Sequence, residues 1–154
     1  FLVGHNSEFK FPKLEIQKYN VGDAIFDLMK TVPRESKFLT TSQDIYIAKY
    51  EKASKCINPR DLYYDKPSRT LTCRNLSGAT GDMHRVKLPD GRRRRLLIKE
   101  AARLQSFPDS FIFTGAAPRQ FHHLGTAVPP LLAFKMAQAL KECYYKEKSS
   151  QFAA

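Results

Sequence analysis

The fold of this chain is decided by two stretches, RRLLIKEAARLQSFPD at residues 94–109 and LGTAVPP at residues 124–130. In the first stretch, Leu97, Ala101 and Leu104 recur at helical spacing. Pro108 ends this helix, because the residue before a proline is pushed out of the α region. The pattern therefore predicts a helix over residues 98–106.

The second stretch predicts a glycine turn at Gly125 followed by a helix that begins at Pro129-Pro130. Prolines are tolerated there, since N–H groups in the first turn of a helix make no hydrogen bond within the helix. Apolar residues follow in two adjacent stripes, so the helix presents a wide apolar face. The stripes consist of Leu132, Met136, Ala139 and Cys143, and of Phe134, Ala137 and Leu140.

The rest of the chain predicts short elements joined by turns. Residues 21–29 have helical spacing, residues 70–73 are typical of a strand, and Pro89-Asp90-Gly91 indicates a turn between strands at 86–88 and 94–97. Residues 34–65 predict irregular structure with one or two short strands, and residues 75–82 predict a loop. We therefore expect an α+β fold, mostly antiparallel, with two helices at its end.

The composition favours a polyanionic partner. The chain has 154 residues, 42% of them hydrophobic, and 26 basic against 15 acidic residues give a net charge of +11. Such a balance points to nucleic acid before membrane, with simple solubility as the alternative, and no apolar span of membrane length is present. Cys56, Cys73 and Cys143 form no Cys-x-x-Cys pair, which fits a reducing compartment.

Three blocks resemble the DNA cytosine-5 methyltransferases, which methylate C5 of cytosine from S-adenosylmethionine. They are Pro67 to Thr72, Glu100 to Pro108 and Gln120 to Pro130, in the order and at the distances of that family. A weaker match lies at residues 21–28, and Phe1-Leu2-Val3-Gly4 looks like the end of a catalytic-domain strand. The resemblance implies a small target-recognition domain followed by a helix that packs on a Rossmann-like catalytic domain.

The catalytic motifs of that family do not occur in this sequence. No proline precedes a cysteine, and there is no Gly-x-Gly, Glu-Asn-Val or Gln-x-Arg-x-Arg. In such enzymes a Cys thiolate attacks C6 of a flipped cytosine. We therefore expect no catalytic residue here, a partner that supplies the catalytic half and binds most of the S-adenosylmethionine, and double-stranded DNA as the second partner.

The resemblance also implies domain boundaries and a location. Residues 1–15 end the catalytic-domain strand and its exit loop, residues 16–122 form the target-recognition domain, residues 123–146 form the returning helix, and residues 147–154 are a tail. A start without Met favours a cut or processed chain, and the missing catalytic motifs leave a split enzyme as the alternative. No signal peptide is present, so we expect a cytoplasmic protein in a prokaryote and a nuclear one in a eukaryote.

On the cofactor side, the resemblance implies contacts from Thr126, Ala127 and Val128. Thr126 stands where the family most often has Asn, so we expect weaker cofactor contact. No metal site is expected, although His122 and His123 are adjacent, because no other ligand lies at suitable spacing.

On the DNA side, the Thr70-Leu71 pair matches one that packs near the flipped nucleotide. Base readout is expected from Arg60, Arg74 and Asn75, since Arg pairs with guanine and Asn with adenine. Phosphate contact is expected from Arg69, Arg92 and Arg93, although a charge run such as residues 92–95 is usually a solvated face.

Two further interpretations of the sequence remain open. Glu100 and Arg103 are three residues apart and can pair on a helix surface, whereas the resemblance favours a buried helix that braces the recognition region. As a whole, the chain is interpreted as the recognition part of a methyltransferase, with an inactive DNA-binding or regulatory relic as the alternative. A self-sufficient methyltransferase and an unrelated basic protein are the remaining readings.

Overall fold

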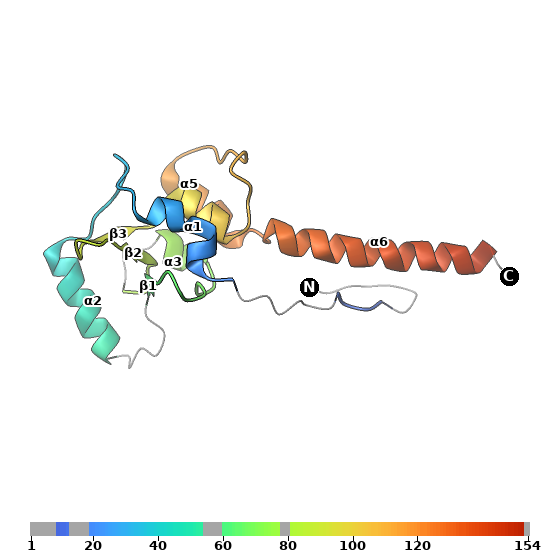
Figure 1. Ribbon diagram of the computed structural model, residues 1–154, viewed down its shortest axis with the longest axis horizontal. Helices are drawn as coiled ribbons and strands as arrows, with labels where there is room; N and C mark the ends of the chain where they lie inside the picture. Colours follow the sequence, from blue (N-terminus) through green and yellow to red (C-terminus); the bar gives the residue numbers. More distant parts are fainter. Residues whose placement is uncertain (1–8, 13–18, 54–59, 78–80, 153–154) are drawn as a thin grey trace. The chain divides into compact units, whose positions relative to one another are not determined.

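The computed structural model describes residues 9–12, 19–53, 60–77 and 81–152, which fall into two compact units. One unit is Lys18–Ala127, and the other combines Phe1–Gln17 with Val128–Ala154. Figure 1 labels their helices and strands. The strand expected at Phe1-Leu2-Val3-Gly4 lies outside the described residues.

The first unit contains a small three-stranded sheet in the order β1-β2-β3. Its strands are β1 (Asp61–Leu62), β2 (Arg85–Lys87) and β3 (Arg93–Arg95). Strands β2 and β3 pair antiparallel across a turn in which Gly91 has a φ of +85°, a value that suits glycine. The hairpin predicted around Pro89-Asp90-Gly91 is confirmed. Because β1 runs parallel to β2, the sheet is mixed rather than mostly antiparallel.

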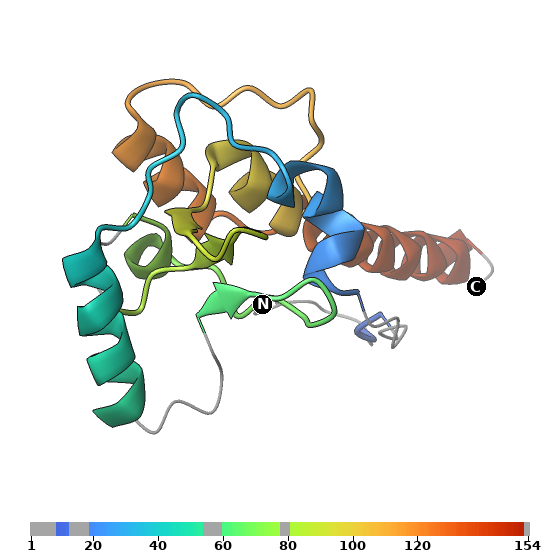
Figure 2. The same ribbon diagram turned by 60° about the vertical axis from the view of Figure 1, so that its left-hand side comes forward.

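Four helices pack together in the same unit. They are α1 (Val21–Met29), α3 (Cys73–Ser77), α4 (Ile98–Leu104) and α5 (Ala117–Thr126). Helix α4 contacts α1 and α5, and α5 contacts α3 (Figure 2). Their apolar residues form one core with Leu62, Val86, Leu88 and Leu96 from the sheet region. The predicted helices at residues 21–29 and 98–106 are therefore confirmed, the second ending two residues earlier.

Helix α2 (Thr41–Ala53) corrects the expectation of irregular structure over residues 34–65. Ile47 is the one buried residue of this helix, so the sequence has no apolar stripe that would predict the helix. Hydrogen bonds between neighbouring residues nevertheless fix the start of α2. The Thr40 N–H donates to Gln43 Oε1 at 2.9 Å, and the Gln43 N–H donates to Thr40 Oγ1 at 3.3 Å. This reciprocal pair is a capping box.

The strand predicted at residues 70–73 and the glycine turn predicted at Gly125 are both wrong. Residues 70–72 belong to no helix or strand, and Cys73 begins α3. Gly125 lies in the last turn of α5, a helix that the sequence did not predict. A Cβ at Gly125 would lie 2.6 Å from the Cα atom of Cys73. The glycine is therefore required for the close packing of α5 on α3, not for a turn.

A buried ion pair joins β3 to α4 and corrects two expectations about charge. Arg94 donates to both carboxylate oxygens of Glu100, at 2.8 and 2.7 Å, and both side chains are fully buried. Arg94 also donates to the Leu28 carbonyl at the end of α1. Arg94 is thus no part of a solvated face. Glu100 pairs with Arg94 and not with Arg103, which agrees with a buried brace.

Arg103 instead links α4 to two acidic residues. It donates to both oxygens of Asp109 and to Asp27 Oδ1, each at 2.7 Å. The two hydrogen bonds from Arg103 to Asp109, together with one from Lys99, hold the pKa of Asp109 well below its usual range. Helix α4 is therefore fixed to the segment that follows it and to α1.

In the second unit, α6 (Pro130–Phe152) begins at Pro130, as the proline pair predicted. Large apolar side chains along it are exposed, among them Leu131, Phe134 and Leu140. Among the described residues, no helix combines the length and the apolar character that a membrane span needs.

Candidate nucleic-acid interface

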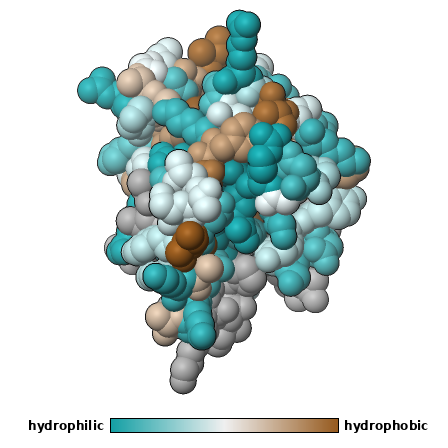
Figure 3. Space-filling view, turned by 90° about the vertical axis from the view of Figure 1, so that its left-hand side faces the viewer, coloured by the Kyte–Doolittle hydropathy of each residue, from teal (hydrophilic) through white to brown (hydrophobic). Residues whose placement is uncertain are grey.

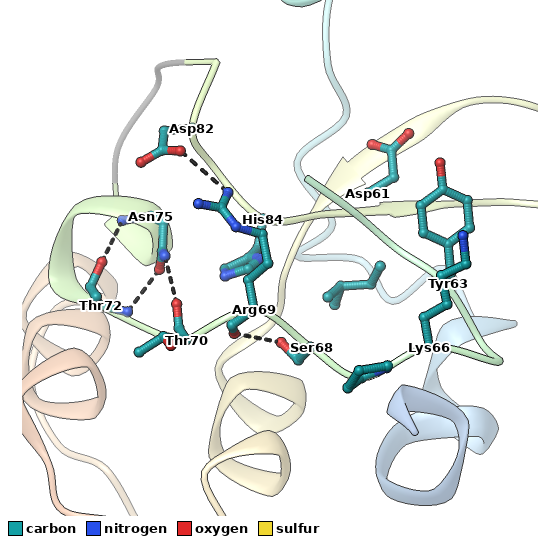
Figure 4. Close-up of a pocket in the computed structure, with 12 residues that line it drawn as sticks. Asp61, Tyr63, Lys66, Ser68, Arg69, Thr70, Thr72, Asn75, Asp82 and His84 are labelled. Atoms are coloured by element: carbon teal, nitrogen blue, oxygen red, sulfur yellow. Dashed lines mark hydrogen bonds and ion pairs between the residues drawn. The ribbon is translucent and has the colours of Figure 1, made fainter. Parts of the chain in front are cut away.

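A cavity of about 620 Å³ lies where β1, the 63–72 loop, α3 and the start of β2 meet. Two cations, Lys66 and Arg69, and two carboxylates, Asp61 and Asp82, line it together with His84 (Figure 4). Hydroxyl and amide groups of Ser68, Thr70, Thr72 and Asn75 complete the polar wall. The wall can thus offer hydrogen-bond donors to an anionic or polar ligand.

The loop beside the cavity is held by the side chain of Asn75. Its Nδ2 donates to the Thr70 carbonyl at 2.8 Å, and its Oδ1 accepts the Thr72 N–H at 2.8 Å. Asn75 is 5% exposed, so little of its amide faces solvent. This arrangement fixes the backbone of residues 70–72 and leaves the Thr70 side chain exposed.

Asp82 sits between two arginines at the edge of the cavity. Its Oδ1 accepts hydrogen bonds from Arg60 Nε at 3.2 Å and from Arg69 Nη1 at 3.4 Å (Figure 4 shows the second). Partial burial pushes the pKa of Asp82 upward, but the two hydrogen bonds outweigh it, and the pKa is lowered. Asp82 is therefore a carboxylate at neutral pH.

Asp61 is neutralised by two arginines of the sheet. Arg85 Nε donates to its Oδ1 at 2.8 Å, and Arg93 Nε donates to its Oδ2 at 2.9 Å. Arg85 is fully buried and also pairs with Glu51, and Arg93 pairs with Asp44. Both oxygens of Asp61 are thus occupied on the side of the sheet.

The structure brings some of the expected DNA-contacting residues together and separates others. Arg69, Thr70 and Asn75 line the cavity, whereas Leu71 belongs to the core. Arg60 is buried beside Asp82, and its guanidinium lies 5.1 Å from the Tyr50 ring.

The remaining three lie outside the cavity wall. Arg74 is exposed on α3. Arg92 is exposed at the hairpin, pairs with Asp90 at 2.7 Å and lies 4.5 Å over the Phe38 ring. Arg93 is engaged with Asp61 and Asp44. The face seen in Figure 3 is mostly hydrophilic, with small hydrophobic patches between the polar side chains.

Sequence reasoning missed Lys66, Asp82 and His84 as members of this site. Asp82 and His84 follow a glycine-containing loop, and Lys66 precedes the Pro67-Ser68 pair, so no local pattern distinguishes them. Their common position depends on the parallel pairing of β1 with β2, which places Asp61 opposite Arg85.

The expected cofactor-side residues lie at the end of α5 and directly after it. The Thr126 hydroxyl lies within hydrogen-bond distance of the His122 and His123 carbonyls, at 3.0 and 3.2 Å. Ala127 adopts extended backbone directly after the helix, and Val128 belongs to the other unit. Within the described residues, no three His, Cys, Asp or Glu side chains form a group that would hold a metal ion.

The family of the chain follows from comparison with known proteins. The model of the C-5 cytosine-specific DNA methylase family matches residues 5–142. The chain belongs to the C-5 cytosine-specific DNA methylases. The resemblance found in the sequence is thereby confirmed at the level of the family, whose members use S-adenosylmethionine as methyl donor.

Several C-5 cytosine-specific DNA methylases are similar to most of this chain. Type II methyltransferase M.AplI of Arthrospira platensis is 54% identical over 143 residues, 92% of this chain and 41% of that protein. DNA (cytosine-5-)-methyltransferase M.ApeKI of Aeropyrum pernix and Type II methyltransferase M.Eco47II of Escherichia coli are each 32% identical, over 86% and 84% of this chain. The chain spans 41%, 27% and 30% of these three proteins.

Proposed function

We propose that this chain is the target-recognition part, with the cofactor-side end, of a DNA cytosine-5 methyltransferase. A catalytic part, in the same protein or in a separate subunit, would supply the thiolate and most of the S-adenosylmethionine site. The observation that carries the proposal is the family match over residues 5–142, joined to a sequence without the Pro-Cys motif. The chain also spans only 41% of M.AplI.

The DNA contacts are proposed for the cavity and the surfaces beside it. Arg69 contacts a phosphate, and Thr70-Leu71 lies near the flipped nucleotide, as the family resemblance implies. Of this pair, Thr70 is exposed and Leu71 is buried, and the Asn75 hydrogen bonds hold the loop that carries them. Arg74 is exposed and reads a base edge.

The other four proposed contacts differ in accessibility. Arg92 lies at the exposed hairpin and Arg93 beside it, and both are proposed to contact phosphate. Arg60 and Asn75 are buried, so base contact by either requires release of its present hydrogen bonds. We therefore expect Arg74 to dominate base readout.

Helices α4 and α6 have different proposed roles. The buried pair of Arg94 with Glu100 makes α4 a rigid brace between the sheet and the other helices. Helix α6 is proposed to pack on the catalytic part, which would cover its exposed Leu131, Phe134 and Leu140. Thr126, Ala127 and Val128 are proposed to contact S-adenosylmethionine there.

The experiment is transfer of a tritiated methyl group from S-adenosylmethionine to duplex DNA. The chain is assayed alone and mixed with a catalytic part that carries the Pro-Cys motif. A third assay mixes the Arg74→Gln variant of the chain with the same catalytic part. We expect transfer only in mixtures, with Arg74→Gln lowering discrimination between target sequences by about 1–3 kcal/mol. Lys87→Gln, an exposed cation outside the cavity wall, is the matched control and should retain the discrimination. Transfer by the chain alone would contradict the proposal.

One observation favours the second candidate, a DNA-binding relic that does not methylate. The Thr126 hydroxyl is directed back at two carbonyls of its own helix, which reduces what it offers to a cofactor. In the same assay, sequence-specific DNA binding with no methyl transfer in any mixture would support the relic.

A further inference from the structure

Helix α2 has two opposite faces of different character, and the inner face holds its acidic residues. Asp44, Ile47 and Glu51 recur at helical spacing, so they share one face. Ile47 is 3% exposed. Asp44 accepts a hydrogen bond from Arg93 at 3.1 Å, and Glu51 accepts one from Arg85 at 2.7 Å. Both carboxylates of α2 are therefore turned toward the sheet, where arginines compensate their charge.

The outer face of α2 is cationic. Its exposed residues also recur at helical spacing, and they are Ser42, Ile45, Lys49 and Lys52. None of the exposed residues of α2, which is described along its whole length, is acidic. Within the described part of the chain, neither lysine forms an ion pair. Figures 1 and 2 show α2 at the margin of its unit, and Figure 3 shows that side as mostly hydrophilic. The outer face is therefore available to an anionic partner.

A network of charges fixes α2 relative to the cavity. Asp61, in the cavity wall, accepts hydrogen bonds from Arg85 at 2.8 Å and from Arg93 at 2.9 Å. The same two arginines hold Glu51 and Asp44, which lie about two helical turns apart. Five alternating charges thus clamp α2 at both halves of its length. A contact surface on an element held in this way keeps a defined geometry.

We propose that the outer face of α2 enters the major groove of the target DNA, with Ser42 and Ile45 at base edges and Lys49 and Lys52 at phosphates. The inference rests on the proposed function, because this DNA is the one that the methyltransferase recognises. The major groove is about 12 Å wide and admits an α-helix. A hydroxyl group can hydrogen-bond base edges there, and an apolar side chain can contact the thymine methyl group.

The length of the outer face assigns the lysines to phosphate. Ser42 and Lys52 lie about 15 Å apart along the axis at about 1.5 Å per residue, which exceeds the groove width of about 12 Å. When the first half of α2 lies in the groove, its second half therefore reaches the phosphates of one wall. Arg92, a proposed phosphate contact, lies near the start of α2, because its guanidinium is 4.5 Å from the centre of the Phe38 ring. Cations thus lie at both ends of the outer face.

The first test measures how salt weakens DNA binding by the full chain assembled with its catalytic part. For Lys49→Gln and for Lys52→Gln we expect the slope of log K against log salt to fall in magnitude by about 0.9, the value for one lost phosphate contact. Lys30→Gln is the matched control, since Lys30 is an exposed lysine at the end of α1 and should leave the slope unchanged. If both α2 variants keep the slope of the parent, the proposal is overturned.

The second test asks whether α2 reads sequence. Duplexes with randomised positions are incubated with the same assembly, and the bound fraction is sequenced for the parent and for the double variant Ser42→Ala with Ile45→Ala. Both side chains are exposed, so the variant should fold as the parent does. We expect the preference at one or more base pairs to fall by about fivefold or more, as for the loss of one base-pair contact. An unchanged preference would overturn the placement of α2 in the major groove.

These measurements separate the inference from the proposed function and from a protein partner. Both tests read binding, so an assembly without methyl transfer in which the α2 variants still act contradicts the proposed function alone. Methyl transfer with α2 variants that bind as the parent does contradicts this inference alone. Sedimentation of the double variant checks assembly. Loss of the catalytic part, with DNA preference retained, would identify the outer face as a protein contact and overturn the proposal.

Discussion

Substitution of Glu100 by Gln tests the central brace of the fold. The Glu100 carboxylate accepts three hydrogen bonds: two from Arg94 at 2.7 and 2.8 Å, and one from the Leu97 N–H at 2.8 Å. Both charged side chains are fully buried, so the substitution leaves a guanidinium without its counter-charge and away from water. Breaking a buried pair in this way costs about 3–5 kcal/mol. That is a large share of the roughly 5–15 kcal/mol that stabilises a typical domain.

The assay is urea unfolding followed by far-UV circular dichroism. With a slope near 2 kcal/mol per molar urea, Glu100→Gln should lower the midpoint by about 1.5–2.5 M. The double variant Arg94→Met with Glu100→Leu should recover much of this loss, because it removes both buried charges together. Asp90→Asn is the control, since its pair with Arg92 is exposed to solvent and contributes little to stability. A Glu100→Gln midpoint equal to that of Asp90→Asn would refute the reasoning.

Three further predictions concern packing, the loop and pH. Gly125→Ala should destabilise the chain by about 1–3 kcal/mol in urea, because the added Cβ forces α5 away from α3; unchanged stability would contradict the close packing. Asn75→Asp removes the donor to the Thr70 carbonyl and should weaken DNA binding in a mobility-shift assay while the circular dichroism spectrum is retained; parent affinity would count against the loop's role. Since Arg103 lowers the folded-state pKa of Asp109, the stabilisation is present at neutral pH and lost below about pH 4; the urea midpoint of Asp109→Asn should fall less steeply there than that of the parent.

The elements that the sequence predicted correctly are those whose signals are local. Helix α4 follows from apolar spacing and Pro108, the hairpin from Pro89-Asp90-Gly91, and the start of α6 from its proline pair. Helix α2 was not predicted, because one buried residue gives no apolar periodicity. Its capping box, however, is visible in the sequence.

Gly125 and the 70–73 segment show how tertiary contacts override local preference. In the sequence, a glycine followed by Thr126 and two prolines indicates a turn. In the structure, Gly125 lies inside α5, and its lack of a Cβ allows α3 to approach closely. The β-branched residues at 70 and 72 favour a strand, but the Asn75 side chain takes the Thr72 N–H and the Thr70 carbonyl that a neighbouring strand would need.

By itself, the sequence determined the family, the basic character and the local elements, because motifs, charge and short-range periodicity are properties of neighbouring residues. Only the tertiary structure decided which cations are buried and which are available. Arg85 donates to Asp61, 24 residues away in sequence, and Arg94 donates to the Leu28 carbonyl, 66 residues away. Lys66 and Arg69, in contrast, line the cavity with His84. Whether an arginine braces a core or faces a ligand depends on partners that are distant in sequence, since a charge is buried only where an opposite charge compensates its lost hydration.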